Sequence, residues 1–410
     1  MNAKIQQAMS ELGGGPLQQD AVQQHIAPLF SRVLSSDTVY LANHSLGRPL
    51  DAMDDDLAEA TAAWYGKLGD AWDGWLEERQ AFRTRIAALI GAARADCVIP
   101  KTSAGQGLRT VLNALPGKPR VISTRGEFDS IDVILKQYAA LERIELQWIE
   151  PDVDGDFTIE PVIDAVNHGK GADLVVISQV MFMSGQILRD LQSLAHACHQ
   201  RGTKLLLDAY HAVGVIPVDV VRLQADFVIG GCYKYLRGGP GACFLYIAPQ
   251  GFEAGLRPLD IGWFANSDPF GYQRPELPVL HAGGDGFLES TPPVLTWYQA
   301  RSGLEFTLAM GVERLRAYSL TQLNALRGYL ADAGVNAVKG GDEDHGAFLA
   351  IRLADAMEFP ARLQREAILC DARGQWLRLC PDCLTRDEEL RRAAAVLGEL
   401  LGSGPGTAGI

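Results

Sequence analysis

Two charged side chains follow apolar runs of the kind that form buried strands. Asp208 ends the run 205–208, Leu-Leu-Leu-Asp, and Lys234 comes shortly after the run 227–230, Phe-Val-Ile-Gly, in a stretch rich in glycine. Open α/β sheets bind ligands at the carboxyl ends of their parallel strands, so we expect both side chains at one edge of a sheet. Each also has a plain structural explanation, since Asp208 suits a helix N-cap and Lys234 a solvated loop.

A lysine and a carboxylate at one sheet edge suit the chemistry of pyridoxal 5′-phosphate. This cofactor needs a lysine amine for its Schiff base, a carboxylate beside its pyridine nitrogen and donors for its phosphate. Residues 100–107, Pro-Lys-Thr-Ser-Ala-Gly-Gln-Gly, follow a predicted strand and open a helix, so their N–H groups and hydroxyls could hold a phosphate. An ordinary capped helix start explains the same residues, which match neither the dinucleotide fingerprint nor the P-loop.

Short β-branched or leucine-rich runs alternate with amphipathic stretches along the chain. The predicted strands are 97–100, 120–123, 174–178, 204–207, 227–230 and 242–247. The predicted helices between them include 105–115, 130–141 and 190–199, and longer helical patterns cover 58–90 and 294–318. This alternation indicates an α/β fold with a mostly parallel, doubly wound sheet, in which the run 242–247 returns as an antiparallel neighbour.

Composition divides the chain into three parts. We expect an N-terminal arm over 1–50 that packs with the small domain, a large cofactor-binding domain over 51–300, and a smaller α/β domain over 301–410. In the last part, 347–353 and 376–379 have the composition of strands between helices.

Charge and cysteine content exclude several classes of partner. The 37 Lys and Arg against 50 Asp and Glu give a formal net charge of −13, which disfavours nucleic acid and anionic membranes. We find no stretch of about 18 apolar residues and no apolar leader, so a cytoplasmic location is expected. The seven Cys are odd in number and suit reduced thiols, and the lone C-x-x-C of Cys380 and Cys383 lacks the second pair that zinc needs, so no metal is expected.

With these residues in place, the chain resembles the class V branch of the fold-type-I pyridoxal-phosphate enzymes, and within it kynureninase. The resemblance runs from about residue 41 to 381 and rests on four ordered motifs. They are Asp-Ala-Tyr-His with its continuation at 208–219, Gly-Cys-Tyr-Lys-Tyr-Leu-Arg-Gly-Gly-Pro-Gly at 231–241, Gly-Trp-Phe at 262–264, and Ser-Thr-Pro-Pro at 290–293.

The resemblance implies a role for each matching residue. It makes Lys234 the Schiff-base lysine, Asp208 the partner of the pyridine nitrogen and Tyr233 a proton donor. Further cofactor contacts are implied for Thr102, Ser103, Phe128, Ser130, Ser178, His211, Tyr233, Trp263 and Thr291. Of these, Trp263 and Thr291 would come from the other subunit of a homodimer.

For the substrate, the resemblance makes Arg378 the residue that grips the α-carboxylate, which suits the bidentate guanidinium fork. His44, Ser45 and Trp72 match positions near the aryl pocket. The resemblance thus implies hydrolytic Cβ–Cγ cleavage of L-kynurenine or a close analogue to an anthranilate-type acid and L-alanine.

The chain departs from the kynureninase pattern in two loops. Residues 128–132, Phe-Asp-Ser-Ile-Asp, lack the family's proline and displace its acidic residue, and 181–185, Met-Phe-Met-Ser-Gly, lose polar groups near the cofactor and substrate. Three other functions therefore stay open: a class V aminotransferase, a cysteine desulfurase-like lyase with Cys370 as its thiol, and a non-catalytic pyridoxal-phosphate-binding protein.

Overall fold

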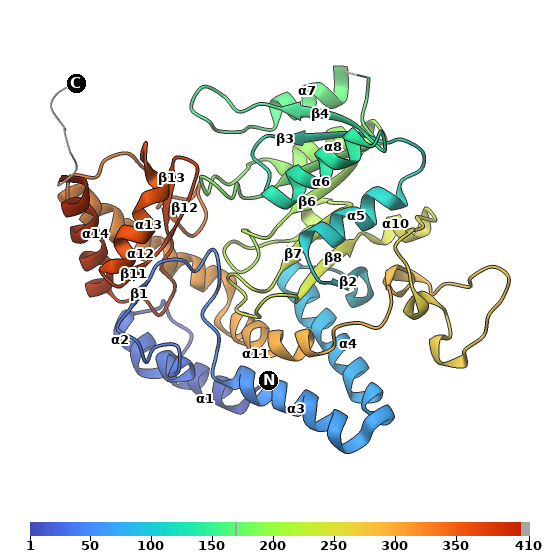
Figure 1. Ribbon diagram of the computed structural model, residues 1–410, viewed down its shortest axis with the longest axis horizontal. Coiled ribbons are helices and arrows are strands. Elements are labelled where there is room, and N and C mark those ends of the chain that lie inside the picture. Colours follow the sequence, from blue (N-terminus) through green and yellow to red (C-terminus); the bar gives the residue numbers. More distant parts are fainter. Residues whose placement is uncertain (169, 403–410) are drawn as a thin grey trace.

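A seven-stranded sheet forms the centre of the larger part of the molecule in the computed structural model, which describes residues 1–168 and 170–402 (Figure 1). Its strand order is β2-β8-β7-β6-β5-β3-β4. The strands are β2 (Val98–Lys101), β3 (Arg120–Thr124), β4 (Glu145–Ile149), β5 (Leu174–Ser178), β6 (Lys204–Asp208), β7 (Phe227–Gly231) and β8 (Cys243–Ile247). Within this sheet β8 is antiparallel to both of its neighbours, as the sequence predicted, and the other six strands point the same way.

Helices cover both faces of this sheet. Along β5, Val175 and Ile177 belong to one hydrophobic cluster, while Leu174 and Val176 belong to another on the opposite face. The first cluster includes residues of α4 (Ala71–Ile90), α7 (Glu160–His168), α8 (Leu191–Gln200) and α9 (Val220–Leu223), and the second includes residues of α5 (Ala104–Ala114) and α6 (Asp129–Ala140). Strands buried on both faces explain the continuous apolar runs in the sequence and confirm the predicted fold class.

A second, antiparallel sheet lies apart from the first, at the left of Figure 1. Its order is β12-β13-β10-β9, and leucines of the neighbouring helices pack with it in a separate core. The elements are β9 (Val338–Lys339), β10 (Leu349–Arg352), β12 (Asp371–Arg373), β13 (Trp376–Leu379), α12 (Val312–Asp332), α13 (Phe359–Arg365) and α14 (Asp387–Gly402).

The first fifty residues run along the lower side of the molecule in Figure 1. Their elements are α1 (Ala3–Leu12), α2 (Gln19–Ala21) and β1 (Val39–Tyr40), and β1 pairs in parallel with β11 (Ile368–Leu369). Apolar side chains of this segment share a core with Phe306 and Met310 of α11 (Leu295–Met310) and with Cys383 and Leu384.

The structure differs from the sequence prediction at several elements. The helical pattern 58–90 forms two helices, α3 (Ala52–Lys67) and α4, and the pattern 294–318 is broken at Gly311, whose φ of +81° ends α11 before α12 begins. Strand β4 was missed because it is an edge strand with an alternating rather than a continuous apolar pattern. The domain boundary at 300/301 stays a prediction and falls inside α11, and residues 403–410 of the predicted C-terminal domain lie outside the described residues.

Among the described helices, none combines the length and the hydropathy needed to cross a bilayer.

Candidate active site

The carboxyl ends of the parallel strands gather the cofactor-side residues. Asp208 ends β6, Ser178 ends the neighbouring β5, and the two residues are direct partners in the strand register. Thr102 follows β2, and Lys234 follows β7 after Cys232 and Tyr233. Sheet topology therefore brings residues from distant parts of the chain to one edge, as expected for an open α/β sheet.

Asp208 is buried and does not begin a helix. One carboxylate oxygen, Oδ1, accepts a hydrogen bond from the backbone N–H of Tyr210 at 2.9 Å, which is the contact of a local turn. Burial raises the pKa of Asp208, while the nearby Lys234 cation lowers it. The turn therefore holds the side chain at the strand end, and burial is the largest influence on its pKa.

Lys234 is 4% exposed, so the solvated-loop explanation is wrong. Its Nζ lies 2.6 Å from Nε2 of His211, whose Nδ1 lies 3.2 Å from the hydroxyl of Tyr235. Burial lowers the pKa of Lys234, Asp208 raises it, and the cation of Arg378 lowers it further. Burial and the Lys234 charge also hold the pKa of His211 well below its usual range. The pKa of Lys234 thus falls to about 7, so a substantial fraction of the amine is uncharged near neutral pH.

Aromatic rings surround the Lys234 amine. Its Nζ lies 5.4 Å from the ring centroid of Phe128, 5.6 Å from that of Tyr233 and 5.8 Å from that of Tyr210. Phe128 also packs edge-on against Phe182 at 5.4 Å. A flat aromatic ligand attached to this amine would meet apolar ring faces.

A glycine of the N-terminal arm contacts the loop that follows β7 and carries Lys234, which we call the lysine loop. The N–H of Gly47 donates to the carbonyl of Tyr233 at 2.8 Å, and a Cβ on Gly47 would lie 1.9 Å from the carbonyl oxygen of Lys234. This close approach excludes any larger residue at position 47. It also carries His44 and Ser45 to the site.

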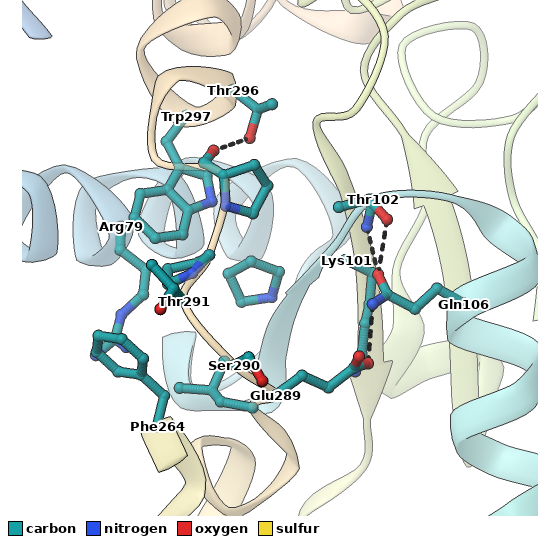
Figure 2. A pocket seen from close by; sticks show the side chains of 14 residues that line it. Arg79, Lys101, Thr102, Gln106, Phe264, Glu289, Ser290, Thr291, Thr296 and Trp297 are labelled. Atoms are coloured by element: carbon teal, nitrogen blue, oxygen red, sulfur yellow. Dashed lines mark hydrogen bonds and ion pairs between the residues drawn. The ribbon is translucent and has the colours of Figure 1, made fainter. Parts of the chain in front are cut away.

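The predicted phosphate donors lie at the start of α5. Ser103 is the N-cap and its hydroxyl accepts from the N–H of Gln106, while the N–H and the hydroxyl of Thr102 both donate to Oε1 of Gln106, at 2.6 and 3.0 Å. Gln106 Nε2 in turn donates to Glu289, as Figure 2 shows. The two Thr102 donors can serve a phosphate once the Gln106 side chain turns away.

A cavity of about 200 Å³ lies beside this segment and is lined by both Thr102 and Thr291. Figure 2 shows Thr291 with Arg79 and Phe264 among the residues that line this cavity. The indole N–H of Trp263 donates to the Thr291 hydroxyl at 3.3 Å, and Trp72 packs on Trp263 at 6.4 Å between ring centroids. Within one chain, Trp72 therefore lies with the two residues predicted to reach the partner's site, rather than with His44 and Ser45.

The predicted substrate residues converge on a carboxylate that the sequence analysis missed. Asp371 accepts from Nε and Nη2 of Arg378 at 2.8 and 2.6 Å, lies 2.7 Å from Nε2 of His44, and accepts from the hydroxyl of Ser45. The Nη1 of Arg378 donates to the carbonyl of Phe182. The sequence did hold a signal for Asp371: Gly374 and the residue after it form a two-residue hairpin loop, which places Asp371 opposite Arg378.

Glu127 is a second functional candidate that the sequence analysis missed. Its carboxylate accepts from the hydroxyls of Ser178 and Thr124, both at 2.6 Å, and from the N–H of Ser178 at 3.2 Å. Burial raises the pKa of Glu127 to about 7, those hydrogen bonds oppose the rise, and the charge of Asp208 adds to it. Its position just after β3 was the available signal. Ser130, predicted to contact the cofactor, lies in the first turn of α6.

The residues present fit pyridoxal phosphate. Lys234 offers a buried amine of lowered pKa, Asp208 a carboxylate, Phe128 a ring face, and Thr102 and Ser103 donors at a helix N-terminus. The protein supplies all the groups that this cofactor requires.

The cysteines are all free, and six of the seven are buried. Cys380 donates its thiol to the carbonyl of Ala347 at 3.0 Å. Over residues 1–168 and 170–402, no three His, Cys, Asp or Glu side chains are grouped as metal ligands.

Comparison with known proteins shows the family of this chain. The sequence model of the aminotransferase class-V family matches residues 50–365. An uncharacterized aminotransferase of Bacillus subtilis strain 168, YcbU, is 26% identical over 83% of this chain and 90% of its own. Kynureninase of Shouchella clausii is 26% identical over 86% and 85%, and that of Pseudomonas fluorescens 27% identical over 73% and 72%.

Solved structures with the same fold include cysteine desulfurase of Thermococcus onnurineus, with a TM-score of 0.77, 18% identity and coverage of 91% of this chain and 96% of that one. A mutant of the cystine C–S lyase C-DES gives a TM-score of 0.81 at 17% identity, covering 91% and 98%. Both show the fold. From the match over more than half of its length, the chain belongs to the aminotransferase class-V family, and its cofactor is pyridoxal 5′-phosphate.

Proposed function

We propose that this protein is a hydrolase that cleaves the Cβ–Cγ bond of L-kynurenine or a close analogue to give L-alanine and an anthranilate-type acid. The observation that carries the proposal is the buried Arg378, which lies near enough to Lys234 to lower its pKa and offers a guanidinium for an amino-acid carboxylate. Similarity to bacterial kynureninases over 73–89% of this chain supports the choice of substrate.

Each residue has a task in this reaction. Lys234 would hold the cofactor through its amine, with Asp208 at the pyridine nitrogen and Phe128 over the ring. Bound pyridoxal phosphate supplies an electron sink for negative charge on the substrate carbons. Because burial lowers the pKa of Lys234, its released amine can take the proton from the substrate α-carbon near neutral pH.

Tyr233 is our candidate proton donor. Burial raises the pKa of its phenol to about 12, so the hydroxyl keeps its proton at neutral pH and can deliver it to the departing β-carbon. Arg378 would hold the α-carboxylate, with His44 and Ser45 beside it.

A class V aminotransferase is the second candidate. Lys234, Asp208 and Arg378 would serve transamination equally well, and YcbU carries the aminotransferase name. Transamination differs from hydrolytic cleavage in needing a keto acid that accepts the amino group. A desulfurase is disfavoured, because burial and the neighbouring Asp371 raise the pKa of Cys370 to about 12, which leaves little thiolate at neutral pH.

We further propose a homodimer with shared active sites. Trp72, Trp263 and Thr291 lie together, and exposed apolar side chains at Leu259, Tyr272 and Leu277 occupy the segment around them. A second subunit would cover these side chains and receive Trp263 and Thr291 in its own site. The cytoplasm remains the predicted location.

The decisive experiment incubates the purified holoenzyme with L-kynurenine and follows anthranilate fluorescence and alanine release. We expect both products in equal amounts, with kcat at least about 10³-fold lower in Lys234→Ala, which removes both the cofactor anchor and the general base. Lys204→Ala is the matched control, because Lys204 begins the strand that Asp208 ends and is predicted to leave the rate unchanged.

Two other outcomes would replace this proposal. Neither product from kynurenine, with amino-group transfer to a keto acid, would assign the aminotransferase. Cofactor binding without turnover of either kind would assign a non-catalytic pyridoxal-phosphate-binding protein.

A further inference from the structure

Asp371 is the common partner of three residues that the sequence assigned to the substrate. It receives two N–H groups of Arg378, the ring Nε2 of His44 and the hydroxyl of Ser45. Arg378 and Asp371 sit opposite each other on neighbouring strands, whereas His44 and Ser45 arrive from the N-terminal arm. The Asp371 carboxylate thus links the strand that carries Arg378 to the N-terminal arm, among the residues predicted to bind the substrate.

Asp371 stays ionised in this arrangement. Burial acts to raise its pKa, but the hydrogen bonds from His44 and Arg378 and the charge of Arg378 outweigh it and hold the pKa of Asp371 well below its usual range. Burial and the Arg378 cation lower the pKa of His44 to about 4, so this ring is neutral at pH 7. An ionised carboxylate only accepts hydrogen bonds, so Nε2 of His44 carries the proton that it donates to Asp371.

The contacts of Arg378 leave part of its guanidinium free for a ligand. Of its five N–H groups, two go to Asp371 and one from Nη1 goes to the carbonyl of Phe182. Two N–H groups remain, one on Nη1 and one on Nη2, at the end of the side chain. The ring of Phe348, whose centroid is 5.6 Å from the guanidinium carbon, supports one face of the group.

We propose that Asp371 is the positioning residue of the substrate site. It binds Nε and Nη2 along one side edge of the Arg378 guanidinium, so that the two remaining N–H groups, on Nη1 and Nη2, face the α-carboxylate of the substrate. This inference rests on the proposed role of Arg378 and adds the group that orients it. A carboxylate on the side edge fixes the plane of the guanidinium, and a fixed plane loses less entropy when a ligand carboxylate binds end-on.

The test compares two amines that differ only in the carboxylate. L-Alanine and ethylamine are titrated into the holoenzyme, and binding is followed by the change in cofactor absorbance. We expect Asp371→Asn to weaken alanine binding about 10-fold to 100-fold and to leave ethylamine binding within about 2-fold, because only alanine uses Arg378. Asp344→Asn is the matched control, since Asp344 pairs with Arg189 on the surface and is predicted to change neither affinity.

A double-mutant cycle separates positioning from direct contact. Arg378→Ala is expected to show the same selective loss for alanine, and Asp371→Asn added to it is expected to cause no further loss. An additional loss in the double mutant would show that Asp371 acts independently of Arg378 and would overturn the proposal.

Two further outcomes would overturn it. Unchanged or tighter alanine binding by Asp371→Asn would make Asp371 a bystander or a competitor of the ligand, and equal weakening of both amines would indicate general disruption of the site. If that variant does not fold, Asp371→Glu moves the carboxylate by one methylene and is expected to weaken alanine alone, and an unchanged alanine-to-ethylamine ratio would contradict the proposal. Because these ligands do not require kynurenine cleavage, the result is independent of the hydrolase assignment.

Discussion

Asp371 and Asp382 both form ion pairs with arginine, but they differ in burial and in the number of arginines that they bind. Asp382 is buried and pairs with two arginines, Arg48 of the N-terminal arm and Arg237 of the lysine loop, and it also accepts from the N–H of Leu384. The Asp371 side chain is 18% exposed and pairs with the single arginine Arg378.

The two clusters also differ in whether a buried polar atom beside them lacks a hydrogen-bond partner. Of the side chains that bind Asp382, none has an atom among the described buried nitrogens and oxygens without a partner, and Arg48 also reaches the hydroxyl of Thr385. Around Asp371, Nδ1 of the buried His44 is among the described atoms without a partner. A saturated cluster holds segments together, whereas an unsaturated one has capacity for a ligand.

Glu127 provides a third case, a buried carboxylate held by hydroxyls and one N–H instead of an arginine. Without a cation, burial dominates and its pKa rises, whereas the pKa values of both aspartates fall. Among these three carboxylates, the pKa falls where arginine donates hydrogen bonds to the carboxylate and rises where no arginine does.

The largest effect that would separate the two clusters is on folding stability. Asp382→Ala leaves two buried arginines unpaired and is expected to lower the free energy of unfolding by about 3–5 kcal/mol. Because the arginines lower the pKa of Asp382, its stabilisation is present above the unfolded pKa of about 3.9 and is lost as pH falls below it. Urea unfolding of the wild type and the variant at pH 7 measures the loss of unfolding free energy, and the same comparison at pH 3 measures how much of this loss depends on an ionised Asp382.

Asp371→Ala is the control for this contrast. Its carboxylate is partly exposed and Arg378 keeps the carbonyl of Phe182, so we expect a loss of about 1–3 kcal/mol. Equal losses in the two variants would remove the distinction between a structural and a ligand-binding cluster.

The next effect concerns the carboxylate without a cation. The pKa of Glu127 is about 7 in the folded protein and about 4.3 when unfolded, so its contribution to stability is fully present below pH 4 and is lost as pH rises through 7. Glu127→Gln cannot ionise, so urea unfolding of the apoprotein between pH 5 and 8 should show a decline in the wild type that the variant lacks. Exposed Glu145→Gln should follow the wild type, and parallel curves for Glu127→Gln would contradict the prediction.

The smallest effect should come from Ser45. Its hydroxyl is one of several groups that bind Asp371, so Ser45→Ala is expected to weaken alanine binding by less than about 10-fold and to change stability by about 1 kcal/mol. A loss as large as that of Asp371→Asn would mean that the N-terminal arm, and not Arg378, determines affinity. Ser36→Ala, which removes only a hydroxyl paired with Thr38, is the control.

Much of the cofactor end could be predicted from the sequence because each residue lies next to a strong local pattern. Asp208 and Lys234 follow buried strands, and a parallel sheet brings such positions to one edge whatever the loops between them do. Glu127 obeys the same rule but was missed, since an acidic residue after a strand is common and only burial distinguishes this one.

The sequence by itself thus determined the fold class and predicted a cofactor lysine and its aspartate, since strand periodicity and short-range motifs are local properties of the chain. Only the tertiary structure decided which carboxylate meets Arg378 and that His44 and Ser45 join it from more than 300 residues away. It also decided that Gln106 occupies the Thr102 donors and that Trp72 lies with Trp263. These contacts depend on side-chain packing between distant segments, which no spacing rule encodes.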